Sequence, residues 1–369
     1  MIRVLQCVNN MHRAGLETIL MNYYRAIDRT QIQFDFLMHR DERSDYDDEI
    51  EQLGGRIYRA PRLYPQNYPA YFRFMKRFFS EHPEYKIVHS HIDAMSYLPL
   101  MAAKRAKVPV RIAHSHSTNI DKDAKFLLKQ LFRFCLRGEA NVFWACGESA
   151  GRFLFGERKA DVVPNAVHPD KFLYDNNVRV DVRKELGVKD AFVIGHVGRF
   201  TYAKNHCFLV DIFASIQEIV PESVLFLVGT GEKQADVEAY VRLLGLQDKV
   251  KFLGVRSDVN RLFQAMDAFV LPSLFEGVPV VGIEAQFASL PCYFSDKVPF
   301  EVSFTPECRF VSLQKSADEW AREVIEARNA QRTPFLEGNM HYNIHIAQKK
   351  LAERYIKLYE SLGTEAIAK

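Results

Sequence analysis

The sequence predicts an α/β fold made of two Rossmann-like halves. Short apolar segments rich in β-branched residues alternate with amphipathic segments along the whole chain, the pattern of βαβ units and parallel sheets. At 369 residues the chain also exceeds the roughly 250–300 residues at which single hydrophobic cores stop growing. Because 48% of the residues are hydrophobic, the chain can bury two ordinary cores. We therefore expect two domains.

Short apolar runs along the chain are the expected strands. In the first half they are residues 3–8, 34–38, 56–59, 87–90, 110–113 and 142–145, and in the second half 192–197, 224–228, 250–253, 268–271 and 292–294. The first run becomes polar too early for a signal peptide, so we interpret it as a buried strand. Helical patterns fill most of the intervals, as parallel sheets require.

The boundary between the halves is expected where the periodic pattern is interrupted. A Pro-Asn pair at 164–165, a His-Pro pair at 168–169 and a polar stretch at 174–177 lie close together, and such residues mark linkers. We place an N-terminal domain at residues 1–172 and a C-terminal domain at 173–345. The remaining segment, 346–369, has the spacing of a helix.

The composition argues against several classes of protein. Lysine and arginine exceed aspartate and glutamate by only three (49 − 46), so a dedicated nucleic-acid binder is not expected. No apolar run approaches the roughly 18 residues that span a bilayer. The six cysteines form no C-x-x-C pair, so neither a zinc site nor a disulfide framework is indicated. We expect a protein of the reducing cytosol.

The most informative segment is 267–284. Residues 268–271 are continuously apolar, and Gly277 and Pro279 then mark a tight turn into a helix. Glu276 is therefore expected in the loop and Glu284 inside the helix. A helix N-terminus suits a diphosphate, and carboxylates accept hydrogen bonds from hydroxyls, so this segment suits a sugar nucleotide. The alternative is a glutamate that caps the turn and a second that is solvated.

Arg199 and Lys204 follow the expected strand 192–197 at its carboxyl end, where open α/β sheets bind ligands. A departing diphosphate needs positive charge, which these side chains can supply. Solvated loop cations are the alternative. Asp121 and Asp123 have the D-x-D spacing of some metal sites, but they are more typical of a charged helix N-terminus. We expect neither a cofactor nor an essential metal.

Gly15 lies between the first strand and a helix expected to begin near Leu16. A glycine there lets the backbone approach a phosphate or a sugar without an intervening Cβ. Glu17 could interact with the amides of the helix N-terminus, a structural role at least as well supported as a catalytic one.

Two pairs of histidines follow expected strands in the first half. His114 and His116 lie in a turn after strand 110–113, where one imidazole could hydrogen-bond a donor sugar or reacting oxygens. A solvated polar turn is the alternative. His89 and His91 end an earlier strand, and we interpret them as polar caps.

A basic stripe is expected on the helix near residues 122–137. Lys125, Lys129, Arg133 and Arg137 recur every four residues among apolar side chains. Such a helix can lie on an anionic membrane surface, and segment 68–79 could extend the stripe. An ordinary helix packed on its sheet with a solvated basic face fits the sequence slightly better.

Taken together, these motifs resemble the retaining family 4 glycosyltransferases, in particular the branch that builds bacterial capsular, exopolysaccharide and teichoic-acid-type glycans. The resemblance covers nearly the whole chain. Its most specific part is the segment with Glu276 and Glu284, which matches the family's E-x7-E pattern. The other matches are residues 11–18, 114–117, 163–167, 198–200 and 204–205.

The resemblance implies a GT-B fold, in which two Rossmann-like domains face each other across a cleft. The N-terminal domain would lie on the acceptor side, the C-terminal domain would bind the nucleotide sugar, and the last helix would cross back to the N-terminal domain. It further implies that Arg199 and Lys204 hold the diphosphate, that Glu276 contacts the transferred sugar and that Glu284 contacts the ribose.

The resemblance also assigns backbone amides of Gly277 and Val278 to the ligand. The family has a histidine after the strand that precedes His114 and His116; we favour His116 for its role, with His114 second. Many relatives carry Gly-Gly where this chain has Ala14-Gly15, which adds a methyl group to the loop.

By resemblance, the chain transfers a sugar from a nucleotide donor, a UDP-sugar, to a cell-surface glycan precursor carried on a polyprenyl diphosphate. The leaving phosphate would deprotonate the acceptor on the same face of the sugar, so no protein base is required. Two other functions stay open. A nucleotide-sugar epimerase on the same fold would need no acceptor, and a non-catalytic subunit that binds a sugar nucleotide would show no turnover.

Overall fold

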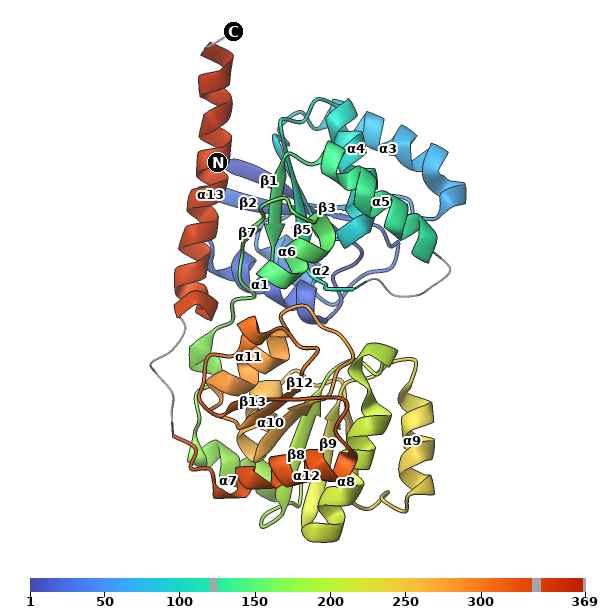
Figure 1. The fold of residues 1–369 in the computed structure, drawn as a ribbon. Coiled ribbons are helices and arrows are strands. Elements are labelled where there is room, and N and C mark those ends of the chain that lie inside the picture. The colour runs from blue at the N-terminus through green and yellow to red at the C-terminus, as the bar shows by residue number, and fades with distance from the viewer. Residues whose placement is uncertain (120–124, 334–339, 368–369) are drawn as a thin grey trace. The chain divides into compact units, whose positions relative to one another are not determined.

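The computed structural model describes residues 1–119, 125–333 and 340–367 (Figure 1). The chain divides into two compact units. Unit 1 comprises Met1–Ala166 together with Met340–Lys369, and unit 2 comprises Val167–Asn339. Each unit is a parallel α/β sheet with helices, as expected for the fold class.

Unit 1 is built on a seven-stranded parallel sheet with the order β3-β2-β1-β4-β5-β6-β7. The strands are β1 (Ile2–Val8), β2 (Ile32–Met38), β3 (Ile57–Arg59), β4 (Ile87–Ser90), β5 (Val110–Ser115), β6 (Val142–Ala145) and β7 (Asp161–Val162). The helices are α1 (Gly15–Ala26), α2 (Asp47–Gln52), α3 (Tyr68–Glu81), α4 (Tyr97–Arg105), α5 (Phe126–Glu139), α6 (Glu148–Phe155) and α13 (Ile344–Ile367).

Unit 2 has a six-stranded parallel sheet with the order β10-β9-β8-β11-β12-β13. The strands are β8 (Phe192–Val197), β9 (Ser223–Val228), β10 (Val250–Gly254), β11 (Ala268–Leu271), β12 (Cys292–Ser295) and β13 (Cys308–Val311). The helices are α7 (Asn176–Glu185), α8 (His206–Ile219), α9 (Gln234–Leu243), α10 (Val259–Ala265), α11 (Val280–Phe287) and α12 (Ala317–Ile325).

Both sheets reverse their strand order in the same way. In unit 1 the chain runs outward from β1 to β3 and then restarts at β4 on the other side of β1, and in unit 2 the same reversal separates β8 from β11. Open α/β sheets bind ligands at this switch point, outside the carboxyl ends of the strands. The topology therefore marks one candidate position in each unit.

All eleven expected strands are present, whereas β7 and β13 were not expected. Both are edge strands, and neither shows a continuous buried pattern from which a strand could be inferred. Strand β5 also extends further than expected, because Ser115 pairs with Ala145 in β6. His114 is therefore a strand residue and not part of a turn.

The division between the units lies after Ala166 and not after residue 172. Two side chains of α1 hold the backbone before that point, since the Tyr23 hydroxyl donates to the Pro164 carbonyl at 2.7 Å and Asn22 donates to the Ala166 carbonyl at 3.2 Å. The Phe172 carbonyl accepts instead from Gln264 in unit 2, at 3.0 Å.

Helix α13 belongs to unit 1, where it contacts α1 (Figure 1). Its Ala347, Leu351 and Tyr355 are buried at the expected helical spacing. Unit 1 thus takes its last element from the end of the chain, after residue 339 and not after residue 345. No helix in the described part of the chain is long and apolar enough to cross a membrane.

Candidate functional site

The loops that follow β8 and β11 form the candidate site of unit 2. The two strands are hydrogen-bonded neighbours at the switch point, so the loops leave the sheet side by side. They are also tied to each other. Leu274 N–H donates to the Ala203 carbonyl at 2.7 Å, and the Asn205 side chain donates to the Pro272 carbonyl at 3.2 Å. Asn205 has φ 55°, a left-handed conformation that asparagine tolerates, and α8 begins at the next residue.

A glycine loop after β9 supports the first of these loops. Phe200 N–H donates to the Thr230 carbonyl at 3.1 Å, and Lys233 N–H donates to the Phe200 carbonyl at 3.0 Å. A Cβ on Gly231 would lie 2.5 Å from the Phe200 oxygen, and one on Gly229 would lie 2.2 Å from the Gly198 oxygen. These glycines are therefore required by the close approach of the two backbones.

Lys204 and Glu276 form the centre of the site. Lys204 Nζ lies 2.5 Å from Glu276 Oε1, and the two side chains are only 16% and 13% exposed. The Ser273 hydroxyl donates to the same carboxylate oxygen at 2.7 Å. The structure thus brings together two residues that the sequence assigned to separate loops, and it leaves the ammonium group at the carboxyl edge of the sheet.

Arg199 lies in the same loop as Lys204 but has a different environment. Its side chain is 75% exposed, and its closest carboxylate is that of Glu232, at 3.7 Å. An exposed pair of this length contributes little to stability. Arg199 is therefore available to a charged ligand at little cost to the fold.

Glu284 lies in the second turn of α11, which begins at Val280, and Glu276 lies in the preceding loop, as expected. Burial raises the pKa of the Glu284 carboxyl to about 8. Among the described residues, nothing donates a hydrogen bond to this side chain. Gly277 and the buried Val278 lie in the turn that leads to the helix N-terminus. Helix N-termini and buried acceptors of this kind suit phosphate and hydroxyl groups, respectively.

Two buried histidines lie near Lys204, and the sequence did not predict that they meet. His196 in β8 and His206 at the start of α8 have ring centroids 4.6 Å apart. Burial and then the charge of Lys204 lower the pKa of His206 to about 4, so the ring is neutral. The pattern around His196 is that of any buried strand residue, so the sequence contains no signal for the pair.

In unit 1, Gly15 is the first residue of α1 and is exposed, one position earlier than the expected start. Ala14, in an extended conformation, is the N-cap and makes no side-chain hydrogen bond. The N-cap residue therefore supplies no side-chain acceptor to the first amides of the helix that follows β1. Gly15 follows β1, one of the two strands at the switch point of unit 1, and its role at a phosphate or a sugar stays a prediction.

Four histidines of unit 1, His89, His91, His114 and His116, form one cluster at the ends of β4 and β5. His89 Nε2 lies 3.0 Å from His114 Nδ1, and His91 Nδ1 lies 2.9 Å from His116 Nε2. The rings of His114 and His116 stack with centroids 4.1 Å apart. The interpretation of His89 and His91 as polar caps is wrong, because both rings are buried, and His89 bonds His114 of β5 while His91 bonds His116, which follows β5.

Burial keeps the cluster neutral. It lowers the pKa of His116 to about 3 and holds the pKa of His89, His91 and His114 well below the usual range. The candidate ligand atoms of His89, His91 and His114 lie within 4.8 Å of one another, a spacing that a transition metal can bridge. Two of the rings already share a hydrogen bond, so a metal would have to displace a ring proton there.

Helix α5 begins at Phe126 and presents an apolar strip to solvent. Leu127, Leu131 and Phe134 recur on one face and are 81%, 56% and 73% exposed, while Phe132 and Leu136 pack into unit 1. Of the expected basic stripe, Lys125 and Arg133 lie over the rings of Tyr64 and Phe153. Residues 120–124, which include Asp121, Asp123 and the start of the expected stripe, lie outside the described residues.

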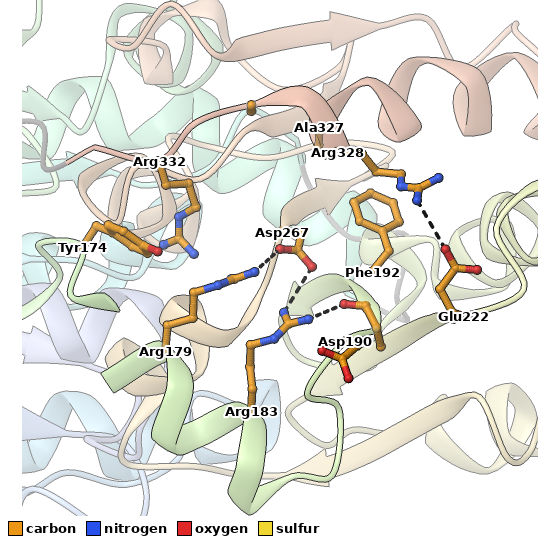
Figure 2. Close-up of a pocket in the computed structure, with 12 residues that line it drawn as sticks. Tyr174, Arg179, Arg183, Asp190, Phe192, Glu222, Asp267, Ala327, Arg328 and Arg332 are labelled. Atoms are coloured by element: carbon orange, nitrogen blue, oxygen red, sulfur yellow. Dashed lines mark hydrogen bonds and ion pairs between the residues drawn. The ribbon is translucent and has the colours of Figure 1, made fainter. Parts of the chain in front are cut away.

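A cavity of about 340 Å³ lies at the other edge of the unit 2 sheet, next to the amino ends of β8 and β11. Figure 2 shows Arg179 and Arg183 of α7 directed at Asp267, which also accepts from Val193 N–H at 2.7 Å. Arg332 lies over the Tyr174 ring and donates to backbone carbonyls. None of the predicted site residues lines this cavity, and its charged groups are used to join α7 to the sheet.

Two family models match the chain. The model described as "Glycosyl transferase 4-like domain" matches residues 14–166, and the model described as "Glycosyl transferases group 1" matches residues 178–336. The first match lies in unit 1 and the second in unit 2.

Similar proteins are found among both sequences and structures. The chain is 35% identical over 342 residues to the Bacillus subtilis (strain 168) protein named "Putative glycosyltransferase EpsF", covering 89% of this chain and 88% of that protein. It is 32% identical over 225 residues to a UDP-Gal:alpha-D-GlcNAc-diphosphoundecaprenol alpha-1,3-galactosyltransferase of Escherichia coli, covering 58% of each. The structure of Anabaena Alr3699/HepE in complex with UDP-glucose matches with a TM-score of 0.76 and 18% identity over 100% of both chains.

Proposed function

Because the chain belongs to the group 1, or family 4, glycosyltransferases and has their GT-B type of fold, we propose that it transfers a sugar from a UDP-sugar to a lipid-linked precursor of a cell-surface glycan. The proposed transfer retains the anomeric configuration of the sugar. The observation that carries this proposal is the group formed by Lys204, Glu276 and Arg199 at the switch point of unit 2.

In the proposed reaction, Lys204 and Arg199 bind the donor diphosphate and stabilise the charge that develops as the sugar leaves. The bond between the anomeric carbon and the phosphate oxygen breaks, and a bond to the acceptor hydroxyl oxygen forms on the same face. The acceptor proton passes to the leaving phosphate oxygen. Glu276 accepts hydrogen bonds from hydroxyls of the transferred sugar, and the amides of Gly277 and Val278 face the ligand.

Glu284 binds the ribose in this proposal. A carboxyl group that is buried without a hydrogen-bond donor is costly to ionise, and two ribose hydroxyls would supply the missing donors. In unit 1, Gly15 and the histidine pair contribute contacts to the substrates, with His116 closest in role to the family histidine and His114 beside it.

Relatives support the choice of donor and acceptor. The Escherichia coli relative is named for a UDP-galactose donor and a diphosphoundecaprenol acceptor, and the Anabaena structure is described as a complex with UDP-glucose. A further relative is the capsular polysaccharide biosynthesis glycosyltransferase CapH of Staphylococcus aureus, 22% identical over 369 residues and covering 96% of this chain and 99% of that protein.

The exposed strip on α5 supports a peripheral contact with the inner face of the cell membrane, where a polyprenyl carrier resides. Leu127, Leu131 and Phe134 would enter the interface, and neighbouring basic residues, including Lys129 and Arg137, would attract anionic lipid at about 1 kcal/mol each. Binding of the purified protein to liposomes with anionic lipid, lost at high salt and in Leu131→Ser/Phe134→Ser, is the expected result. No binding at low salt would contradict it.

We also propose that transfer needs no metal and no cofactor, because Lys204 and Arg199 already supply positive charge for the diphosphate. The deciding experiment is a thermal-shift screen with UDP, GDP, ADP, their sugar conjugates and NAD, each with and without EDTA. Stabilisation by the uridine compounds, unchanged by EDTA, is expected. A response only to NAD, or to none of them, would contradict the proposal.

A transfer assay then separates this function from its alternatives. An epimerase would convert the donor sugar without an acceptor, whereas a transferase releases UDP in proportion to the glycosylated acceptor. A non-catalytic subunit would be stabilised by the nucleotide and show neither reaction. The Lys204–Glu276 pair supports a diphosphate site, which all three functions share, so the assay decides between them.

A further inference from the structure

Two rows of hydrogen bonds run through the core of unit 1 to the carboxyl end of β5. In the first row the Tyr355 hydroxyl lies 2.7 Å from His89 Nδ1, and His89 Nε2 lies 3.0 Å from His114 Nδ1. In the second, Gln6 Oε1 lies 2.8 Å from His91 Nε2, and His91 Nδ1 lies 2.9 Å from His116 Nε2. Gln6 Nε2 also donates to the Tyr355 hydroxyl at 3.3 Å, which joins the rows.

The second row fixes where the proton of each ring lies. The Gln6 carbonyl oxygen can only accept, so His91 donates through Nε2–H. A neutral imidazole carries one proton, so His91 Nδ1 accepts, and His116 must donate to it through its own Nε2–H. His116 Nδ1 therefore holds a lone pair.

The first row ends in an N–H donor, whereas the second row ends in a lone pair. The Tyr355 hydroxyl accepts from Gln6, and among the described residues His89 Nδ1 is the remaining partner to which it can give its single proton. His89 then donates from Nε2 to His114 Nδ1, which places the proton of His114 on Nε2. His114 Nε2 is buried and has no hydrogen-bond partner among the described residues. A buried N–H without a partner calls for an explanation, and a ligand atom is one.

We propose that Tyr355 and Gln6 are positioning residues that hold a proton on His114 Nε2 and a lone pair on His116 Nδ1, so that the end of β5 presents one donor and one acceptor to a sugar hydroxyl. A hydroxyl both accepts and donates one hydrogen bond, and it carries no charge. The two rings are stacked neighbours and neutral, so the pair favours a hydroxyl over a phosphate. This inference rests on the proposed function, because it assigns the hydroxyl to a substrate of the transfer.

The first test removes only the hydroxyl of Tyr355. Tyr355→Phe should lower kcat by about 10–100-fold, the range found when a partner that orients a metal-binding histidine is removed. Tyr23→Phe is the matched control, since Tyr23 is also buried in unit 1 and its hydroxyl donates to the Pro164 carbonyl and to no histidine. Equal activity in the two variants, at equal thermal stability, would overturn the inference.

A double-mutant cycle shows whether Tyr355 acts through His114. Tyr355→Phe should lower kcat in the wild type and cause little further loss when His114 is already alanine, because the residue it orients is gone. Equal losses in both backgrounds would mean that Tyr355 acts by another route and would overturn the inference.

The third test does not depend on activity. Nitrogen-15 spectra of protein with labelled histidine report which ring nitrogen carries the proton, and all four rings are expected to carry it on Nε2. A proton on Nδ1 of His114 or His116 would overturn the inference even if the enzyme transfers sugar. If the wild type transfers no sugar, the proposed function fails, while these spectra still decide the protonation.

Discussion

Lys204 and Glu276, separated by 72 positions in the sequence, meet at 2.5 Å in the structure. Their pairing depends on the neighbouring positions of β8 and β11, whose loops are also joined through the backbone at Leu274 and Ala203. A largely buried ion pair of this kind is weak evidence for stability, since desolvation offsets much of the attraction. Its position at the switch point is more easily explained by ligand binding.

Lys204→Ala should lower sugar transfer by about 1–3 kcal/mol of transition-state stabilisation, the range for a lost charge-assisted contact. It should also destabilise unit 2, because Glu276 keeps the Ser273 hydroxyl but loses its cation. The control is Lys233→Ala, an exposed lysine of the adjacent loop that pairs with Asp236. The measurement is kcat/KM for the donor. An equal fall in both variants would argue against a specific role of Lys204.

Arg199→Ala should separate function from stability. The side chain is 75% exposed and only 3.7 Å from its closest carboxylate, so its loss should leave the melting temperature almost unchanged. Transfer should fall by about 1–3 kcal/mol if Arg199 contacts the diphosphate. Glu232→Gln removes the partner instead. If that variant lost as much activity, the pair, and not a contact of Arg199 with the donor, would be responsible.

Glu284→Gln should stabilise the protein, increasingly so at higher pH. Burial raises the pKa of this carboxyl from 4.5 to about 8, so between these values the folded state holds a proton that the unfolded state releases. Stability of the wild type therefore falls as pH rises through this window, by up to about 1.4 kcal/mol per pH unit. The glutamine variant lacks this loss.

Denaturation of both proteins at pH 5, 6.5 and 8 measures the effect, with Glu232→Gln as an exposed control. A stability difference that did not grow with pH would show that Glu284 is ionised in the folded protein. The same variant should bind UDP more weakly, because an ionised carboxylate accepts from both ribose hydroxyls and an amide oxygen does so less strongly.

Much of the fold could be predicted because buried strands have a local signature. The continuous apolar runs located β8 and β11, and a glycine and a proline located the turn before α11, so the loop position of Glu276 and the helical position of Glu284 followed. Strands β7 and β13 lack such runs, because β7 has only two residues, neither of them buried, and only one residue of β13 is buried.

The contacts of the site could not be predicted in the same way. Hydrophobic periodicity gives the position of His89 on a strand but not which side chain of the next strand it meets, and pairing of β4 with β5 decides that. The other partner of His89, Tyr355, is separated from it by 266 residues in the sequence, much more than its partner on β5. A helical face is visible in the sequence, but the surface that it covers is not.

Asp267→Asn should destabilise unit 2 without a direct effect on chemistry. Its carboxylate accepts from Arg179, Arg183 and the Val193 amide, and the Arg183 side chain is only 8% exposed (Figure 2). Removing one partner of a buried pair costs about 3–5 kcal/mol. Glu222→Gln, which breaks the exposed pair with Arg328, is expected to cost less than about 1 kcal/mol. Equal melting temperatures for the two variants would contradict this account.

Gly231→Ala should impair transfer although residue 231 makes no proposed contact with the donor. The added Cβ would lie 2.5 Å from the Phe200 oxygen and 2.7 Å from its nitrogen, so the backbone beside Arg199 has to move. Small displacements of groups that position a substrate can cost about 100-fold in rate. Gly138→Ala is the control, since its Cβ meets nothing within 4 Å. Because Glu284 lies on another element, UDP binding should weaken less in Gly231→Ala than kcat falls. A normal kcat in Gly231→Ala would show that the glycine loop does not set the position of Arg199.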